Sequence, residues 1–274
     1  MSMLPPRFVT LNNDIRMPIM GLGAWDMYGQ EAEQAVVDAL DVGYRLIDTA
    51  AMYDNEQDVG RALQRSGVLR SEVFVTTKLN NNAHGYDEAL KAFDESLGKL
   101  GLEQVDLYLI HWPIREGRKA SWRALEQIYA EGRARAIGVA NYDRILLEEL
   151  FDTAGIVPAV NQIECSPWLF QPELMEYCRA NHIQMQSYCP ITRGIKFNDP
   201  RLHPICERYG KTPAQVVLNW HVCHGISTIP KSVRRERLQE NLGALSFSLS
   251  EHDMNEMDSW DEGFRICEPP SDFY

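Results

Sequence analysis

The stretch YDEALKAFDESLGKLGLEQVDLYLIH, residues 86–111, places a helical pattern directly before a strand-like run. Over residues 86–100, apolar side chains recur at the i, i+3, i+4 and i+7 spacing of one helix face. The segment 105–111 that follows is short and mainly aliphatic, which is typical of a buried strand. A helix that leads into such a strand is the repeating unit of a parallel sheet.

The same alternation runs along the chain. Strand-like segments are predicted at residues 19–22, 45–48, 73–78, 105–111, 134–139, 159–163, 183–187 and 227–229. Helical patterns lie between them, and Gly43 is a natural stop for the helix that begins near residue 31. Eight such units fit a closed barrel better than an open sheet. The sequence therefore predicts an α/β fold, a single (β/α)8 TIM barrel with residues 1–274 as one domain.

An additional element is predicted before the first barrel strand. In FVTLNNDIRMPIM, residues 8–20, the turn-forming residues Asn12, Asn13 and Asp14 separate two apolar runs. This pattern indicates an N-terminal β-hairpin, which we expect to cap the bottom of the barrel.

Charge, hydropathy and cysteine content limit the partners and the location that the sequence allows. The 274 residues carry a net charge of -12, which disfavours binding to nucleic acid. No continuous apolar run approaches the ~18 residues of a membrane span, and the N-terminal segment has no apolar core of a secretory signal. The six cysteines form no CxxC pair, and because no export signal is found we expect free thiols and a cytoplasmic location. A monomer is the simplest expectation for the oligomeric state.

Ionisable residues end three neighbouring predicted strands, where barrel enzymes carry their catalytic groups. These residues are Asp48, Lys78 and His111, and Tyr53 lies in the loop after the first of the three strands. The Lys78 ammonium would lower the pKa of the Tyr53 phenol, and Asp48 would balance the buried ammonium. His111 would orient a carbonyl oxygen. Such a set suits reduction of a carbonyl group, in which an oxygen must receive a proton as negative charge develops on it.

Other interpretations of the same residues are open. Asp48 and Lys78 could form a purely structural ion pair. A metal-dependent barrel hydrolase would need several His and Asp ligands at the strand ends, where only one histidine is found. His221 and His224, with Cys223 between them, have helical spacing but no evident third ligand, so no metal site is predicted.

The order of the motifs resembles one known family. GYRLIDTAAMYDNEQDVG at residues 43–60 is similar to the signature segment of the aldo-keto reductases, and VTTKL, DLYLIHWP, IGVAN, VNQIECSP and IPKSVRRERLQEN follow in the family's order. The likeness covers residues 7–260 approximately. The short chain and the segment PKSVRRERLQENL resemble the bacterial branch that includes 2,5-diketo-D-gluconate reductases. It implies an NADP-dependent oxidoreductase that reduces an aldehyde or ketone.

The resemblance also implies roles for individual residues. Tyr53 would be the general acid, Lys78 its partner, Asp48 the counter-ion of Lys78, and His111 the orienting group. NADPH would be the hydride donor, with Tyr188 stacked on the nicotinamide, Asn141 and Gln162 on its carboxamide, and a clamp on the 2′-phosphate. The residues implied in cofactor binding are Gly23, Asp48, Asn141, Gln162, Tyr188, Lys231, Ser232, Val233, Arg237, Glu240 and Asn241.

Two departures from the family pattern affect the expected site. Ala140 stands where a serine is usual, and Asn80 where an aromatic wall residue is common. With a short loop after His111 and a short C-terminal tail, we expect an open, polar pocket for a small or polar carbonyl compound, keto sugar acids included. Its substrate-contacting residues are predicted to be Trp25, Tyr53, Asn80, His111 and Trp112. A cofactor-binding regulatory protein with little turnover is the alternative function.

Overall fold

Eight parallel strands form a barrel in the computed structural model, which describes residues 4–267 and residue 269. They are β3 (Leu22–Gly23), β4 (Leu46–Asp48), β5 (Phe74–Leu79), β6 (Val105–Ile110), β7 (Ala134–Ala140), β8 (Val160–Glu164), β9 (Gln184–Tyr188) and β10 (Ser227–Thr228). Each strand pairs with its neighbours in sequence order. The barrel closes where Gly21 N donates to Thr228 O and Thr228 N donates to Ile19 O, both at 2.8 Å.

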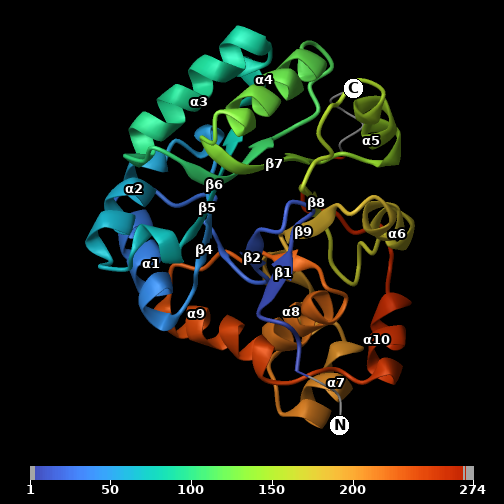
Figure 1. The fold of residues 1–274 in the computed structure, drawn as a ribbon. Helices are drawn as coiled ribbons and strands as arrows, with labels where there is room; N and C mark the ends of the chain where they lie inside the picture. Colours follow the sequence, from blue (N-terminus) through green and yellow to red (C-terminus); the bar gives the residue numbers. More distant parts are fainter. Residues whose placement is uncertain (1–3, 268, 270–274) are drawn as a thin grey trace.

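Helices follow the strands and surround the barrel (Figure 1). They are α1 (Gly29–Val42), α2 (Glu56–Arg65), α3 (Tyr86–Leu100), α4 (Arg118–Ala130), α5 (Arg144–Phe151), α6 (Pro172–Ala180), α7 (Leu202–Tyr209), α8 (Pro213–Cys223), α9 (Arg235–Leu242) and α10 (Glu251–Asp258). Short 3-10 helices are η1 (Ala51–Tyr53), η2 (Arg70–Glu72), η3 (Asn81–Ala83), η4 (Thr192–Asn198) and η5 (Gly243–Ser246). None of the helices in the described part of the chain is long and apolar enough to cross a membrane.

Local sequence explains where the helices begin and end. Helix α1 stops at Gly43, whose φ of 111° is accessible to glycine and whose N–H caps the carbonyls of Ala39 and Leu40. Helix α8 begins with a capping box between Thr212 and Gln215, with a proline at its first position. The helix stop predicted at Gly43 is therefore confirmed.

The predicted N-terminal hairpin is present as β1 (Phe8–Thr10) paired with β2 (Arg16–Pro18). Its buried side chains Leu11 and Met17 belong to the cluster that fills the barrel interior. The Asn13 amide donates to Arg135 O, near the start of β7, at 2.9 Å. The hairpin therefore covers the N-terminal ends of the strands, as expected, and lies across the centre of the ring of helices in Figure 1.

The strand predictions are confirmed in number, but the first is displaced. Strand β3 covers Leu22–Gly23, whereas the segment predicted as a strand at 19–22 mostly serves to close the barrel against β10. Gly23 has a steric reason to be glycine, because a Cβ there would lie 2.6 Å from Ile229 O. The single-domain prediction for residues 1–274 extends beyond the described residues.

Side-chain alternation along the strands decides what reaches the barrel interior. Successive side chains of a strand point to opposite faces. Leu46, Phe74 and Leu107 fill the lower interior. The period of two therefore turns Asp48 and Lys78 inward as well, at the upper ends of β4 and β5.

Close packing of α2 on α3 gives a test of the fold. A Cβ on Gly60 would lie 2.4 Å from the backbone oxygen of Leu100, which cannot move aside like a side chain. We expect Gly60→Ala to lower the free energy of unfolding by about 1–3 kcal/mol, as overpacking does. Gly98→Ala is the matched control, because a Cβ on this exposed glycine of α3 meets nothing within 4 Å. Gly98→Ala should raise the free energy of unfolding by up to about 1 kcal/mol. Equal urea midpoints for the two variants would contradict the packing.

Candidate active site

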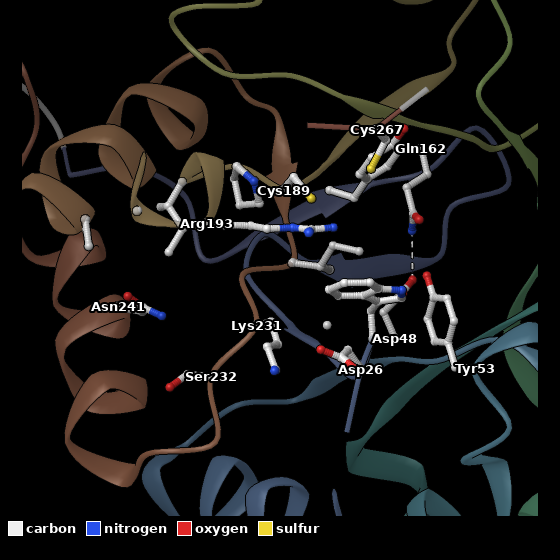
Figure 2. A pocket seen from close by; sticks show the side chains of 18 of the residues that line it. Asp26, Asp48, Tyr53, Gln162, Cys189, Arg193, Lys231, Ser232, Asn241 and Cys267 are labelled. Atoms are coloured by element: carbon white, nitrogen blue, oxygen red, sulfur yellow. Dashed lines mark hydrogen bonds between the residues drawn. The ribbon is translucent and has the colours of Figure 1, made fainter. Parts of the chain in front are cut away.

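A cavity of about 880 Å³ opens at the C-terminal ends of the strands. Its walls come from the strand ends, from the loops after β9 and β10, from α9 and from the C-terminal segment. The lining residues are Gly23, Trp25, Asp26, Asp48, Met52, Tyr53, His111, Trp112, Asn141, Gln162, Tyr188, Cys189, Pro190, Ile191, Arg193, Gly194, Phe197, Ala214, Ile229, Lys231, Ser232, Arg237, Glu240, Asn241 and Cys267. Figure 2 shows Asp48 and Tyr53 at one end, and Lys231, Ser232 and Asn241 toward the other.

A buried ion pair lies beneath one end of this cavity. Lys78 Nζ lies 2.5 Å from Asp48 Oδ1, and both side chains are at most 1% exposed. The ammonium also donates to Thr49 O at 2.9 Å and to the Tyr53 hydroxyl oxygen at 3.4 Å. All three ammonium hydrogens thus have acceptors, which a buried cation requires. Because the Tyr53 oxygen accepts from Lys78, the phenol hydrogen itself can point toward the cavity.

The pKa of Tyr53 differs from the expectation. We expected the Lys78 ammonium to lower it, but burial of the phenol and the negative charge of Asp48 raise the pKa of Tyr53 well above its usual value. Asp48 offsets the charge of Lys78, so the phenol sees little net positive charge. Burial likewise raises the pKa of Asp48 and lowers that of Lys78, and their contact opposes both shifts. Tyr53 therefore holds its proton at neutral pH.

His111 completes this end of the cavity. Its ring meets that of Tyr53 edge to face, with the centroids 5.4 Å apart. Burial and the charge of Lys78 hold the pKa of His111 well below its usual value, so the imidazole is neutral. Its Nδ1 atom is buried and has no hydrogen-bond partner among the described residues. A neutral imidazole can donate one hydrogen bond from its ring and accept one.

Three side chains from neighbouring strand ends form a hydrogen-bonded wall beside the ion pair. Gln162 Nε2 donates to Asp48 Oδ2 at 2.8 Å, the contact drawn as a dashed line in Figure 2. Tyr188 donates from its hydroxyl to Asn141 Oδ1 at 2.7 Å, and Asn141 Nδ2 donates to His111 O at 2.9 Å. Asn141 has a φ of 64°, a conformation that asparagine tolerates better than most residues. These contacts fix the orientation of the Tyr188 ring.

The far end of the cavity is basic. Lys231 and Ser232 follow β10, and Arg237 lies in the first turn of α9. Arg235 of the same basic run instead forms ion pairs with Asp38 and Asp41 of α1. Two cations and a hydroxyl beside a helix N-terminus are groups that bind a phosphate.

Most of the predicted site residues meet at this one cavity. Lys78 lies directly behind Asp48 rather than in the lining. Two other predicted residues do not line the cavity: Val233 packs against the hydrophobic core, and Asn80 precedes η3. The prediction of an open site was based partly on the short C-terminal tail. Residues 268 and 270–274 of that tail lie outside the part of the chain that the structure describes.

Sequence reasoning missed several lining residues. Cys189 and Arg193 follow the C-terminal end of β9, a position that alone could have singled them out. The Arg193 guanidinium lies over the Trp25 ring, 4.3 Å from its centroid. Cys267 comes from the C-terminal segment, and no motif marks it. Its backbone N–H donates to a Glu164 carboxylate oxygen at 3.0 Å.

The histidines considered for a metal have other partners. Both ring nitrogens of His221 contact backbone carbonyl oxygens, those of Val217 and Cys165. His224 contacts Asp258. Within the described residues, one group has metal-ligand spacing, His252 with Asp253 and Glu256 on α10, and Asp253 there is bonded to Arg208 and Tyr209.

Known proteins resemble the chain over most of its length. Residues 19–262 match the sequence model of the Aldo/keto reductase family. A morphine 6-dehydrogenase of Pseudomonas putida is 44% identical, covering 96% of this chain and 94% of its own. A glyoxal reductase of Bacillus subtilis is 43% identical, covering 96% of each. A mutant of Gox0644, solved in complex with NADPH, superposes with a TM-score of 0.92 at 38% identity, covering 96% of this chain and 97% of its own.

Breaking the buried ion pair tests its contribution to stability. Asp48→Asn should lower the free energy of unfolding by about 3 kcal/mol, because it leaves the Lys78 ammonium buried without a counter-ion. The double variant Asp48→Asn/Lys78→Met should recover part of that loss in urea unfolding.

A surface pair provides the control for this measurement. Arg144 and Glu148 are largely exposed, so Glu148→Gln should change the unfolding free energy by less than about 1 kcal/mol. If the double variant is no more stable than Asp48→Asn alone, the charge of Lys78 is not what destabilises the single variant.

Proposed function

This chain belongs to the aldo/keto reductase family, and on that basis we propose that Tyr53 is the group that protonates the substrate oxygen. The protein is an NADP-dependent oxidoreductase that reduces an aldehyde or ketone to the alcohol. The observation that carries the proposal for Tyr53 is its position. Its hydroxyl lines the cavity and lies 3.4 Å from a buried ammonium whose own counter-ion is in place.

The proposed acid has the properties that the step requires. Its raised pKa keeps a proton on the phenol until negative charge develops on a carbonyl oxygen nearby. When the proton leaves, the phenolate lies beside the Lys78 ammonium, which stabilises it. Asp48 keeps that ammonium charged inside the barrel. The neutral His111 imidazole donates a hydrogen bond that orients the carbonyl oxygen, a role that an aspartate or glutamate could not fill.

NADPH is the cofactor, and when bound it supplies the hydride that the carbonyl carbon receives. The cavity fits such a molecule: it is large, it is basic at one end, and at the other it holds the buried His111 Nδ1, which has no partner in the described part of the chain. We assign the 2′-phosphate to Lys231, Ser232 and Arg237, and the adenine to Glu240 and Asn241. Tyr188 would stack on the nicotinamide, with Asn141 and Gln162 on its carboxamide. Asp48 and Gly23 would complete the cofactor wall.

For the substrate we propose a small or polar carbonyl compound. Trp25 and Trp112 supply apolar walls, and Arg193 adds a positive charge that suits a carboxylate, as on a keto sugar acid. One relative is named a glyoxal reductase and another a morphine 6-dehydrogenase, and the two compounds in these names differ widely in size. We further propose a single domain, a monomer and a cytoplasmic location. The intact set of four ionisable residues favours turnover over a purely regulatory role.

Tyr53→Phe tests the proposed acid. The substitution removes the proton donor and keeps the ring, so kcat for an aldehyde such as glyoxal should fall by at least about 100-fold. NADPH affinity should change little, because the hydroxyl is assigned to the substrate oxygen. Quenching of tryptophan fluorescence by NADPH measures that affinity, since Trp25 and Trp112 line the cavity. Turnover close to that of the unmodified protein would rule out Tyr53 as the acid.

Arg237→Ala tests the phosphate clamp. Loss of a charge-assisted hydrogen bond should weaken NADPH binding about tenfold or more, while NADH, which has no 2′-phosphate, should bind almost as before. Arg235→Ala is the matched control, because this neighbouring arginine pairs with α1 instead of lining the cavity. Equal losses for the two cofactors, or equal losses in the two variants, would contradict the assignment of Arg237.

A further inference from the structure

Two cysteines face each other on the wall of the cavity. Cys189 directly follows Tyr188 at the end of β9, and Cys267 lies in the C-terminal segment. The Cys189 and Cys267 side chains lie close enough for each to shift the pKa of the other. Figure 2 shows the two side chains above the cavity, Cys189 next to Arg193 and Cys267 next to Gln162. Neither residue has a role in the hydride transfer proposed above.

The backbone on each side holds the two thiols in place. The Glu164 carboxylate accepts hydrogen bonds from the N–H groups of Ile266 and Cys267, at 2.5 and 3.0 Å. On the opposite side, Thr192 N donates to Cys189 O at 2.9 Å and closes a tight turn. The positions of the two thiols are therefore fixed by backbone hydrogen bonds, to Glu164 of β8 on one side and within the loop after β9 on the other.

The two thiols differ in acidity. The neighbouring Cys189 side chain lowers the pKa of Cys267, and the Arg193 charge and the Tyr188 hydroxyl act in the same direction, against burial and the Glu164 charge. The neighbouring Cys267 side chain, together with burial, raises the pKa of Cys189. Burial raises the pKa of Cys178 to about 11 and also raises that of Cys206. Cys267 is thus the more acidic partner, with a second thiol in contact.

We propose that Cys267 and Cys189 form a reversible disulfide when the protein meets a hydroperoxide. A thiolate with a resolving cysteine beside it is the arrangement of redox-sensing sites. The Cys267 thiolate attacks the hydroperoxide: an S–O bond forms, the O–O bond breaks, and the alcohol or water leaves after protonation. Cys189 then attacks the resulting sulfenic acid, so that the S–S bond forms, the S–O bond breaks, and water leaves. Two thiols are oxidised and one hydroperoxide is reduced.

The disulfide would change access to the cavity. It would tie the C-terminal segment covalently to the residue beside Tyr188, on the wall assigned to the nicotinamide. Ligands that enter or leave along this wall would then meet a fixed segment instead of one held by hydrogen bonds. This consequence for turnover rests on the proposed function, whereas formation of the bond does not.

The experiment treats the full-length protein with hydrogen peroxide and determines intact mass and cysteine-linked peptides. The expected product has lost two hydrogen atoms, yields a Cys189–Cys267 peptide, and returns to the starting mass with dithiothreitol. Cys189→Ser should stop at the sulfenic or a higher acid of Cys267, and Cys267→Ser should leave Cys189 reduced. Cys206→Ser is the matched control, since Cys206 is also half-buried, and should form the bond as the unmodified protein does.

Turnover is measured on the same samples. Carbonyl reduction should slow severalfold after peroxide treatment, recover with dithiothreitol, and be insensitive to this cycle in Cys189→Ser. A protein that turns over but yields no Cys189–Cys267 peptide, or links other cysteines equally, overturns the disulfide proposal. Unchanged turnover in linked protein overturns the effect on access. A protein that forms the link but reduces no carbonyl compound refutes the proposed function instead.

Discussion

The contact on which the site depends is the ion pair between Lys78 and Asp48 inside the barrel. A lone ammonium at this depth would lose its proton or destabilise the fold, and a lone carboxylate would gain one. Together, with Thr49 O and Gln162 as further partners, they keep a charge pair above the apolar lower interior of the barrel. The Tyr53 hydroxyl accepts a hydrogen bond from the Lys78 ammonium of this pair. The position of the proposed acid therefore depends on the requirement that a buried ammonium has a counter-ion.

The balance of charge in the pair also sets the protonation of its neighbours. Tyr53 and His111 both lie beside the pair, yet both are neutral at pH 7, because burial and a charge of the pair act in the same direction in each case. Burial and the Asp48 charge raise the pKa of Tyr53, and burial and the Lys78 charge lower the pKa of His111. Two neutral hydrogen-bond donors therefore face the cavity from one end, while Lys231 and Arg237 give the other end fixed positive charge, and Arg193 adds a further charge on the wall beside Trp25. This separation suits a ligand that is anionic at one end and reacts at the other.

Much of this arrangement could be predicted from the sequence because strands impose strict periodicity. The spacing from Leu46 to Asp48 and from Phe74 to Lys78 already places both charges inside the barrel, and the ends of parallel strands meet at one edge. Residues in loops were less predictable. Arg193 and Cys267 reach the cavity through turns and tail contacts that leave no periodic pattern. Asn80 was predicted from one position of a motif that resembles the family's, and it lies outside the lining. The raised pKa of Tyr53 depends on its burial by distant segments, which spacing along the chain does not reveal.

The most direct test of the account is a crystal structure of the complex with NADPH. The account predicts that the nicotinamide ring lies on Tyr188, that its reactive face is turned toward the space in front of the Tyr53 hydroxyl and His111, and that Lys78 Nζ stays within hydrogen-bonding reach of that hydroxyl. A nicotinamide bound away from Tyr188, or a Tyr53 side chain turned out of reach of Lys78, would contradict it.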